Sequence, residues 1–387
     1  MTERARTGTE RVRSARAAAM LAVLLTLSAL LPGCGDEAAP PEGDFAVLAQ
    51  ANAAYEQALP GAALVFPRDH GPHPGYRIEW WYLTANLVDD RGRDWGLQWT
   101  LFRTAMRPPG DAADPDNPWQ ASQLYMAHFA VSAPDGHRAY QRYARGGDFD
   151  GIRQAGARAA PFAAWLDDWR LESVGGDWLP LRLVAAQGAL AAELELDSDR
   201  PLVLQGESGF SQKHPEGGGS FYYSHPWLAV SGTLRAGGEA IPVRGQAWLD
   251  REWSSQFLQD DQLGWDWFAL HLDSGDKLMA FQLRGTDGGQ YRHAVLLRSD
   301  GGRRVAAPEE LVLEETRRAA VAGRELPLGW RLIWPDAGLD LRVDAGLDDQ
   351  WMDVDFPYWE GRVIASDAEG ERVGVGYLEM TGYGTDP

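Results

Sequence analysis

The sequence predicts an all-β protein made of two related domains of antiparallel strands. Many short apolar runs are separated by turns rich in Asp, Gly and Pro, a hairpin pattern occupies Ala247–Arg284, and a similar pattern occupies Ile78–Arg103. Many short strands at this spacing favour a β-sandwich or barrel over alternating βαβ units.

The stretch Ala247–Arg284 contains the clearest hairpin and an unusual set of tryptophans and acids. Apolar residues alternate on both sides of the turn Asp273–Asp276, which is the period-two signature of paired strands. Asp266 lies between Trp265 and Trp267, so on a strand it faces the opposite side of the sheet from both. If that side is the inside of a barrel, burial raises the pKa of the carboxyl.

An earlier stretch has the same order of features. Ile78–Leu87 contains an acid and aromatics, Asp89–Asp94 is a polar turn, and Trp95–Arg103 is an apolar strand that ends in Arg, as the later stretch does at Arg284. Two readings are open: a duplicated β-domain, or a chance match between two ordinary hairpins.

Residues 1–33 are predicted to be a lipoprotein signal peptide. An arginine-rich start precedes the apolar run Ala17–Leu31, which is too short to span a bilayer comfortably. The run ends in LPGC at Cys34, which resembles the lipobox of bacterial lipoproteins, so we expect Cys34 to be lipidated. Gly35 is compatible with delivery to the outer membrane, facing the periplasm. The alternative is an ordinary secreted protein cleaved near Ala38.

The remaining chain is predicted to have three parts. Residues 34–60 form a tether and a short helix around Phe45–Leu59. Because more than 300 residues remain, a single core is expected to split, with domains at 61–236 and 237–387.

Composition excludes several functions. Lys and Arg number 36 against 56 Asp and Glu, a net charge of −20 that repels phosphate backbones and excludes nucleic-acid binding. Cys34 is the single cysteine, so an intramolecular disulfide and a thiol nucleophile within the mature domains are excluded. The sequence has no nucleophile elbow, phosphate loop or dinucleotide fingerprint. His70 and His73 lack an apparent third metal ligand, so we predict neither a metal nor a cofactor.

Polar groups embedded in aromatic strands are the remaining candidates for chemistry. In one reading each acid pairs with a nearby arginine, for example Asp250 with Arg251 or Arg244. In the other, some line an apolar cavity and act as general acid and base. The group comprises Glu79, His128, Asp250, Glu252, Asp266, His271, Tyr291 and His293.

From about Phe66 to Tyr383 the chain resembles the lipocalin-like family that joins AttH-type secreted proteins to the carotenoid 1,2-hydratases, whose members are often described as secreted hydrolases. The motifs that carry this resemblance are Glu79-Trp-Trp-Tyr82, Met126-Ala-His-Phe129, Tyr222-Tyr-Ser-His-Pro-Trp227, Gly245–Trp253, Gly264-Trp-Asp-Trp-Phe268 and Tyr358-Trp-Glu-Gly361. The resemblance implies two lipocalin-like β-barrel domains with an apolar ligand site within or between them.

The resemblance also implies a mechanism without a cofactor, in which an acid protonates an isoprenoid double bond and water captures the cation. Asp266 stands where the hydratases carry a histidine between tryptophans, and Tyr291-Arg-His293 resembles their Tyr-x-Asp acid element. We therefore predict catalytic roles for Asp266, His293, Asp250 and Tyr291. The predicted ligand-binding residues are Trp265, Trp267, Trp248, Trp253, Glu79, Trp81 and His128.

These observations lead to a lipid-anchored envelope protein that binds an apolar, lipid- or isoprenoid-like ligand. Three functions are compatible with it: an enzyme for hydration or hydrolysis of that ligand, a lipocalin-type carrier, and an accessory subunit of an envelope ABC transporter that contacts the permease. The third reading reflects the association of AttH-type proteins with transporter operons.

Overall fold

The computed structural model describes residues 54–110, 121–146 and 154–384, all within the unit Gly43–Pro387. Their regular structure consists of strands and two short 3₁₀ helices, η2 (Arg68–His70) and η3 (Pro335–Ala337), so the all-β prediction is confirmed. Of the predicted helix at 45–59, only residues 54–59 are described, and they contain a turn and a bend but no helix. The predicted signal peptide and Cys34 lie outside the described residues.

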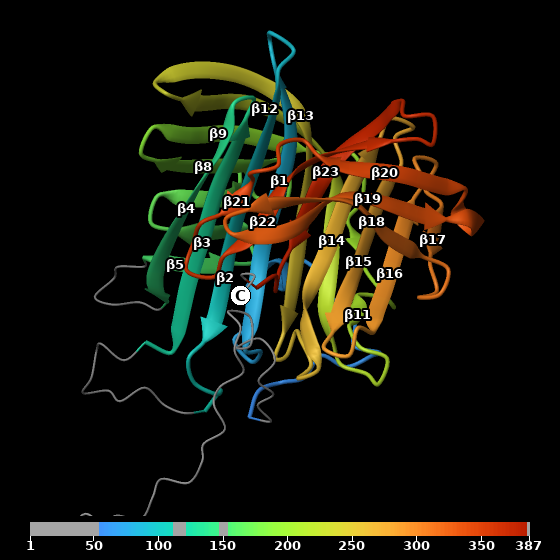
Figure 1. Cartoon of the computed structure of the whole chain (residues 1–387). Coiled ribbons are helices and arrows are strands. Elements are labelled where there is room, and N and C mark those ends of the chain that lie inside the picture. Colours follow the sequence, from blue (N-terminus) through green and yellow to red (C-terminus); the bar gives the residue numbers. More distant parts are fainter. Residues whose placement is uncertain (1–53, 111–120, 147–153, 385–387) are drawn as a thin grey trace, which may run out of the picture. The chain divides into compact units, whose positions relative to one another are not determined.

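The first sheet contains thirteen strands: β1 (Ile78–Asp89), β2 (Asp94–Ala105), β3 (Gln123–Ala133), β4 (Gly136–Gly146), β5 (Ala155–Arg158), β6 (Ala163–Leu166), β7 (Trp169–Ser173), β8 (Leu181–Gln187), β9 (Leu190–Asp197), β10 (Val203–Leu204), β11 (Phe210–Gln212), β12 (Gly219–Ala236) and β13 (Glu239–Ser254). Eleven of them close into a barrel, because β9 pairs with β12 while β12, β13 and β1 to β9 are neighbours in that order (Figure 1). Neighbouring strands are antiparallel except for β4 and β5.

The second sheet contains ten strands: β14 (Gln262–Leu272), β15 (Lys277–Gly285), β16 (Gln290–Leu297), β17 (Arg303–Val305), β18 (Val312–Val321), β19 (Arg324–Trp334), β20 (Leu339–Ala345), β21 (Trp351–Met352), β22 (Tyr358–Ser366) and β23 (Arg372–Met380). Its main order is β17-β16-β15-β14-β23-β22-β20-β19-β18. This sheet is a curled half-barrel, so the lipocalin-like arrangement consists of one closed barrel and one open half-barrel.

Both predicted hairpins form, as β1–β2 and β14–β15. Each begins a run of consecutive neighbours, from β1 to β9 in the first sheet and from β14 to β17 in the second. The first strand of each run also pairs with the last long strand of its own sheet, β13 or β23. This shared topology favours duplication over a chance match.

The chain passes from the first sheet to the second between β13 and β14, whereas the sequence predicted the boundary at residues 236/237. That boundary falls in the tight turn that joins β12 to β13, where Gly237 and Gly238 have φ values of 60° and 89°. Glycine adopts this left-handed backbone without a steric penalty, which suits a two-residue hairpin turn. The stretch Ala247–Arg284 therefore contributes to both sheets.

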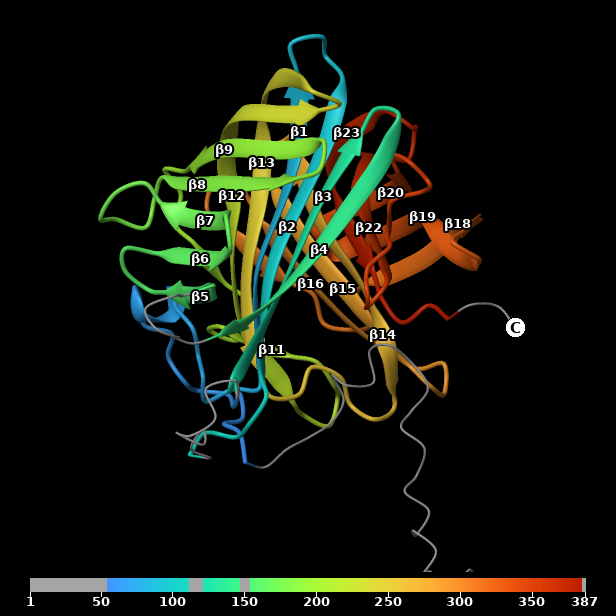
Figure 2. The ribbon, with the colours of Figure 1, turned by 90° about the vertical axis from the view of Figure 1, so that its left-hand side faces the viewer.

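Alternating side chains along the strands build three apolar layers. Trp81 and Leu83 point into the barrel, whereas Trp80 and Tyr82 point out of it. In the second sheet, Phe268 belongs to the inner core, and the outward-facing residues of both sheets form a third, aromatic layer between them. Figures 1 and 2 show β22 and β23 beside β1 and β2, in agreement with the packing of β1 on β23 and of β2 on β22.

Within the described part of the chain, no helix has the length and apolar character needed to cross a membrane.

Candidate functional site

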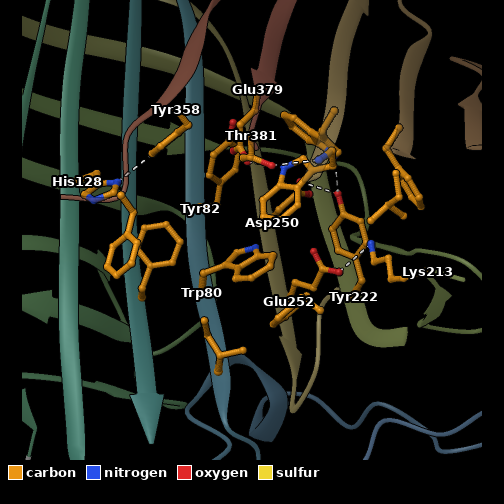
Figure 3. Close-up of a pocket in the computed structure, with 18 of the residues that line it drawn as sticks. Trp80, Tyr82, His128, Lys213, Tyr222, Asp250, Glu252, Tyr358, Glu379 and Thr381 are labelled. Carbon is orange, nitrogen blue, oxygen red and sulfur yellow. Dashed lines mark hydrogen bonds and ion pairs between the residues drawn. The ribbon is translucent and has the colours of Figure 1, made fainter. Parts of the chain in front are cut away.

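A pocket with a volume of about 170 Å³ lies in the layer between the two sheets. The barrel supplies side chains from β1, β2, β3, β12 and β13, and the second sheet supplies them from β14, β15, β22 and β23 (Figure 3). The lining is dominated by aromatic rings, among them Trp80, Tyr82, Phe102, Tyr222, Phe257, Trp265, Trp267, Phe281, Phe356 and Tyr358. Carboxyl groups set into such walls are poorly solvated.

Asp250 of β13 is the most strongly hydrogen-bonded carboxyl in the pocket. Its oxygens accept hydrogen bonds from Tyr222 Oη at 2.6 Å, Ser224 Oγ at 2.5 Å and Trp248 Nε1 at 2.7 Å. Trp267 Nε1 in turn donates to Tyr222 Oη at 3.3 Å. Burial raises the pKa of Asp250 to about 7, although the three donors favour its ionised form.

Glu379 of β23 is the second acid in the lining. Its carboxyl accepts a hydrogen bond from Trp265 Nε1 at 2.6 Å. Burial raises the pKa of Glu379 to about 7; the donor from Trp265 opposes this, and the charges of Glu252 and Asp250 add to it. The two carboxyls therefore lie close enough to influence each other, and both exchange protons near neutral pH.

A lysine–glutamate pair forms another part of the lining (Figure 3). Lys213 Nζ is 2.9 Å from Glu252, and Ser220 Oγ donates a hydrogen bond to the same carboxylate. The ammonium also lies 4.4 Å from the centroid of the Phe281 ring and 5.1 Å from that of Tyr222. The pocket can therefore hold a positive charge against aromatic faces.

His128 of β3 lies at the opposite side of the pocket (Figure 3). Its Nε2 is 3.1 Å from the side-chain oxygen of Gln141, and its Nδ1 is 2.9 Å from Tyr358 Oη. Burial lowers the pKa of His128 to about 4, so its ring is neutral at pH 7. A neutral ring with Nε2 protonated accepts a hydrogen bond from Tyr358.

The AttH-like family matches residues 57–383, which is most of the chain. The chain belongs to the AttH-like family. A crystal structure of a putative AttH from Nitrosomonas europaea is 36% identical in sequence, covers 85% of this chain and 100% of its own, and has a TM-score of 0.75. Among the curated proteins, none matches this sequence.

Two more distant structures share the fold of this AttH-like chain. Kievitone hydratase from Nectria haematococca is 17% identical, covers 86% of this chain and 97% of its own, and has a TM-score of 0.60. The structure of CghA with Sch210972 is 14% identical, covers 88% and 99% respectively, and has a TM-score of 0.52.

Five of the candidate residues from the sequence meet in the pocket of this AttH-like protein. The pocket is lined by Asp250, Glu252, His128, Trp265 and Trp267. Trp248 lies behind the lining, fully buried, and donates its indole hydrogen bond to Asp250. Alternation along β3, β13 and β14 explains the grouping, because these side chains all face the space between the sheets.

Tyr291 and His293 lie one strand beyond the lining, on β16. They pair with Leu283 and Phe281 of β15, which line the pocket. Burial, together with the charges of Lys213 and Arg303, lowers the pKa of His293 to about 4. Burial raises the pKa of Tyr291. Both residues therefore back the wall of the pocket in their neutral forms.

Asp266 faces away from the pocket, on the opposite side of β14 from Trp265 and Trp267, as the alternation predicts. It is fully buried and pairs with Arg284 Nη1 at 2.5 Å. It also accepts hydrogen bonds from Gln282 at 2.8 Å and Tyr383 Oη at 2.9 Å. Asp266 therefore fits the interpretation in which each acid pairs with a nearby arginine, here Arg284.

Glu79, Trp81 and Trp253 lie inside the barrel rather than in the pocket. Glu79 forms buried ion pairs with Arg103 and Arg251. Burial alone would raise the pKa of Glu79, but the charges of Arg251 and Arg103 outweigh it and hold the pKa well below its usual range. The guanidinium of Arg251 lies 3.8 Å from the centroid of the Trp81 ring and 5.2 Å from that of Trp253. This cluster lies inside the barrel together with the apolar side chains of its inner core.

Sequence reasoning did not single out five residues that shape the pocket: Tyr82, Lys213, Tyr222, Glu360 and Glu379. Tyr82 and Tyr222 do occur within the motifs that carry the family resemblance, as does Glu360. The sequence feature that indicates some of them is the alternation of side chains along a strand, since Trp80 and Tyr82 point to the opposite face from Glu79 and Trp81.

Proposed function

We propose that the pocket between the sheets binds an apolar ligand and catalyses acid–base chemistry on it without a cofactor, as a hydratase-like or hydrolase-like enzyme. The observation that carries this proposal is the presence of two carboxyls, Asp250 and Glu379, with pKa values of about 7 among aromatic walls. A general acid or base works best when its pKa lies near the working pH. The fold shared with kievitone hydratase supports a hydratase-like reaction.

The two carboxyls are suited to different roles. Asp250 receives three hydrogen bonds, which stabilise a carboxylate and make it the base. Glu379 receives one, from Trp265, which makes it the better proton donor. Burial and the charge of Asp250 raise the pKa of Tyr222 well above its usual range, so this hydroxyl remains a donor to Asp250.

In the hydration of a carbon–carbon double bond, Glu379 gives its proton to one carbon and leaves a positive charge on the other. The faces of Trp265 and Trp267 stabilise that charge. A water molecule adds to the cation while Asp250 removes its proton, so one proton leaves Glu379 and one arrives on Asp250. The apolar walls exclude further water and strengthen the electrostatic interactions in the site.

Filling the pocket is expected to remove the bound ligand. Thr104 lines the pocket and is half-buried, so Thr104→Trp places an indole in the space that the ligand needs. Native mass spectrometry of protein purified from its own host is expected to show an apolar small molecule on the wild type and none on Thr104→Trp.

The matched control is Thr233→Trp, on the outer face of β12 and outside the pocket. It is expected to retain the ligand. A ligand carried equally by all three proteins would place the binding site elsewhere. A ligand that binds but is never converted would favour the carrier or the transporter-accessory function.

We also propose that Cys34 carries the lipid anchor, with the protein facing the periplasm from the outer membrane. The support is the LPGC motif after an apolar run and the lack of any other cysteine in the sequence. Cys34→Ser is expected to move the protein from the membrane fraction to the soluble periplasmic fraction, because one acyl chain holds a protein only weakly and a multiply acylated cysteine holds it firmly. Membrane retention equal to wild type on immunoblots would contradict the anchor.

A further inference from the structure

Glu360 and Glu379 stand directly opposite each other on the antiparallel strands β22 and β23. Side chains at such positions lie on the same face, with Cβ atoms about 5 Å apart. Glu379 lines the pocket, whereas Glu360 lies behind it and is 1% exposed. Two carboxylates this close repel each other strongly, so the pair is most stable with at least one proton.

The surroundings of Glu360 contain donors and acids but no paired cation. Tyr82 Oη of β1 donates to Glu360 Oε1 at 2.5 Å, while Oε2 is enclosed and has no hydrogen-bond partner among the described residues. Tyr358 and Tyr377 also face it, and Arg362, further along β22, pairs with Asp94 instead.

Glu79 provides a direct contrast. It is as deeply buried, but it pairs with two arginines. No ion pair reaches Glu360 in the described part of the chain, so the proton is the charge that neutralises it. Burial raises the pKa of Glu360 well above its usual range, and the charge of Glu379 raises it further.

A series of polar side chains leads from Glu360 of the second sheet to the barrel strand β4. Tyr358 lies next to Glu360, and its Oη is 2.9 Å from His128 Nδ1. His128 Nε2 then reaches the side-chain oxygen of Gln141 at 3.1 Å, on the half-buried strand β4. The fully buried carboxyl therefore lies beside Tyr358, whose hydrogen bond to His128 begins a route to a strand that contacts solvent.

We propose that Glu360 is a positioning residue that stores a proton behind Glu379 and returns it to Glu379 after that residue has released its own. The proton moves from the Glu360 carboxyl to the Glu379 carboxylate while Tyr358 gives its hydroxyl proton to Glu360. His128, in the tautomer with Nδ1 protonated, gives that proton to Tyr358, and its Nε2 takes one from solvent. Because Glu360 holds a proton more tightly than Glu379 does, the transfer is completed only as Glu360 is reprotonated. The role of Glu360 in the catalytic cycle rests on the proposed role of Glu379 as the acid. Storage of the proton on Glu360 and its transfer to Glu379 can both be measured without a ligand.

Storage of a proton on Glu360 is tested by infrared difference spectroscopy of the carboxylic acid carbonyl band at about pH 9. Asp250 and Glu379, with pKa values of about 7, are ionised at that pH, as are ordinary glutamates with a pKa of about 4.3. The wild type is expected to keep one buried carboxylic acid band and Glu360→Gln to lose it. The control Glu369→Gln, in the β22–β23 turn, is expected to keep it. A band that persists in Glu360→Gln would overturn the proposal.

Glu379→Gln provides a second test if Glu360→Gln does not fold. With its charged neighbour removed, Glu360 is expected to lose its proton at a lower pH than in the wild type, so the band disappears earlier in an alkaline titration. An unchanged titration would show that the pair does not share protons and would overturn the proposal.

Transfer of the proton from Glu360 to Glu379 is tested by stopped-flow pH jumps from about pH 9 to about pH 6. The jump is followed through the fluorescence of Trp265, whose indole N–H donates a hydrogen bond to Glu379. Subtracting the signal of Trp265→Phe isolates this residue from the other tryptophans. Reprotonation of Glu379 is expected to be slower in Glu360→Gln than in the wild type and in Glu369→Gln. Equal rates in all three would overturn the return step. A protein that passes both tests but converts no ligand would refute the proposed function while leaving the proton store in place.

Discussion

Asp250→Asn is expected to slow conversion of the ligand by about 10²–10⁴-fold while leaving ligand binding nearly unchanged. Asparagine keeps the size of the side chain, and its single amide oxygen can still accept the hydrogen bonds that Trp248 and Ser224 give to Oδ1. Its amide nitrogen then faces the hydroxyl of Tyr222, and the side chain cannot take a proton from water. The check is the rate of product formation by mass spectrometry, together with ligand binding by tryptophan quenching. An undiminished rate would remove Asp250 from the reaction.

The pH dependence of the wild-type rate follows from the same two carboxyls. Asp250 must be ionised and Glu379 protonated, and both have pKa values of about 7. The rate is therefore expected to rise and then fall around pH 7, with the two limbs belonging to the pair as a whole. Asp250→Asn is expected to lose the acidic limb, since no base remains to be ionised.

The stability of this variant provides an independent control. Because the pKa of Asp250 rises from 3.8 to about 7 on folding, the folded protein binds an extra proton between these values. The free energy of unfolding contributed by Asp250 therefore falls as pH rises through that window, by about 4 kcal/mol. Asp250→Asn is expected to gain stability relative to the wild type between about pH 4 and pH 7.

Only the comparison between the two proteins isolates Asp250. Buried histidines such as His128 and His293 have pKa values lowered to about 4, so their contribution to stability rises over the same pH range. These groups are common to both proteins and cancel in the difference between their chemical denaturation curves. A difference that stays constant with pH would mean that Asp250 is not a buried, protonated acid.

Arg251→Met is expected to destabilise the protein by about 3–5 kcal/mol, because it removes one partner of a buried ion pair and leaves charge behind. Arg251 is fully buried inside the barrel, pairs with Glu79 and donates to the carbonyl oxygen of Gly71 at 2.5 Å. The variant also loses the stacking of the guanidinium on Trp81. Urea denaturation followed by circular dichroism measures the change.

The matched control is Arg182→Met, which removes an exposed ion pair between β8 and β9. Exposed pairs contribute no more than about 1 kcal/mol, so this variant is expected to unfold nearly as the wild type does. Equal losses in the two variants would contradict the structural role given to the barrel interior.

The sequence was sufficient to predict the strands and the direction of their side chains. It was not sufficient to predict what packs against each face of a sheet. Period-two alternation gave both hairpins and placed Asp266 opposite Trp265 and Trp267, because side-chain direction follows directly from strand geometry. It could not show which face would meet the second sheet. One of the two arginines paired with Glu79 in the barrel is Arg251, 172 residues later, and no local spacing encodes that contact.

The candidate site depended on the same long-range pairing. Asp250 was predicted because it stood among tryptophans, and its neighbours Trp248 and Tyr222 explain its role in the pocket. The Glu360–Glu379 pair required the register of β22 and β23, and the contact between Tyr82 and Glu360 joins residues 278 positions apart. Such contacts arise from the packing of one sheet on the other.

The measurement that tests the central claim most directly is conversion of the ligand in water enriched in ¹⁸O. The ligand recovered from the host protein is incubated with the wild type and with Asp250→Asn, and the product is analysed by mass spectrometry. The account predicts a product that gains one labelled oxygen with the wild type and gains it far more slowly with the variant. Recovery of the ligand unchanged from both proteins, with binding intact, would contradict it and leave a carrier.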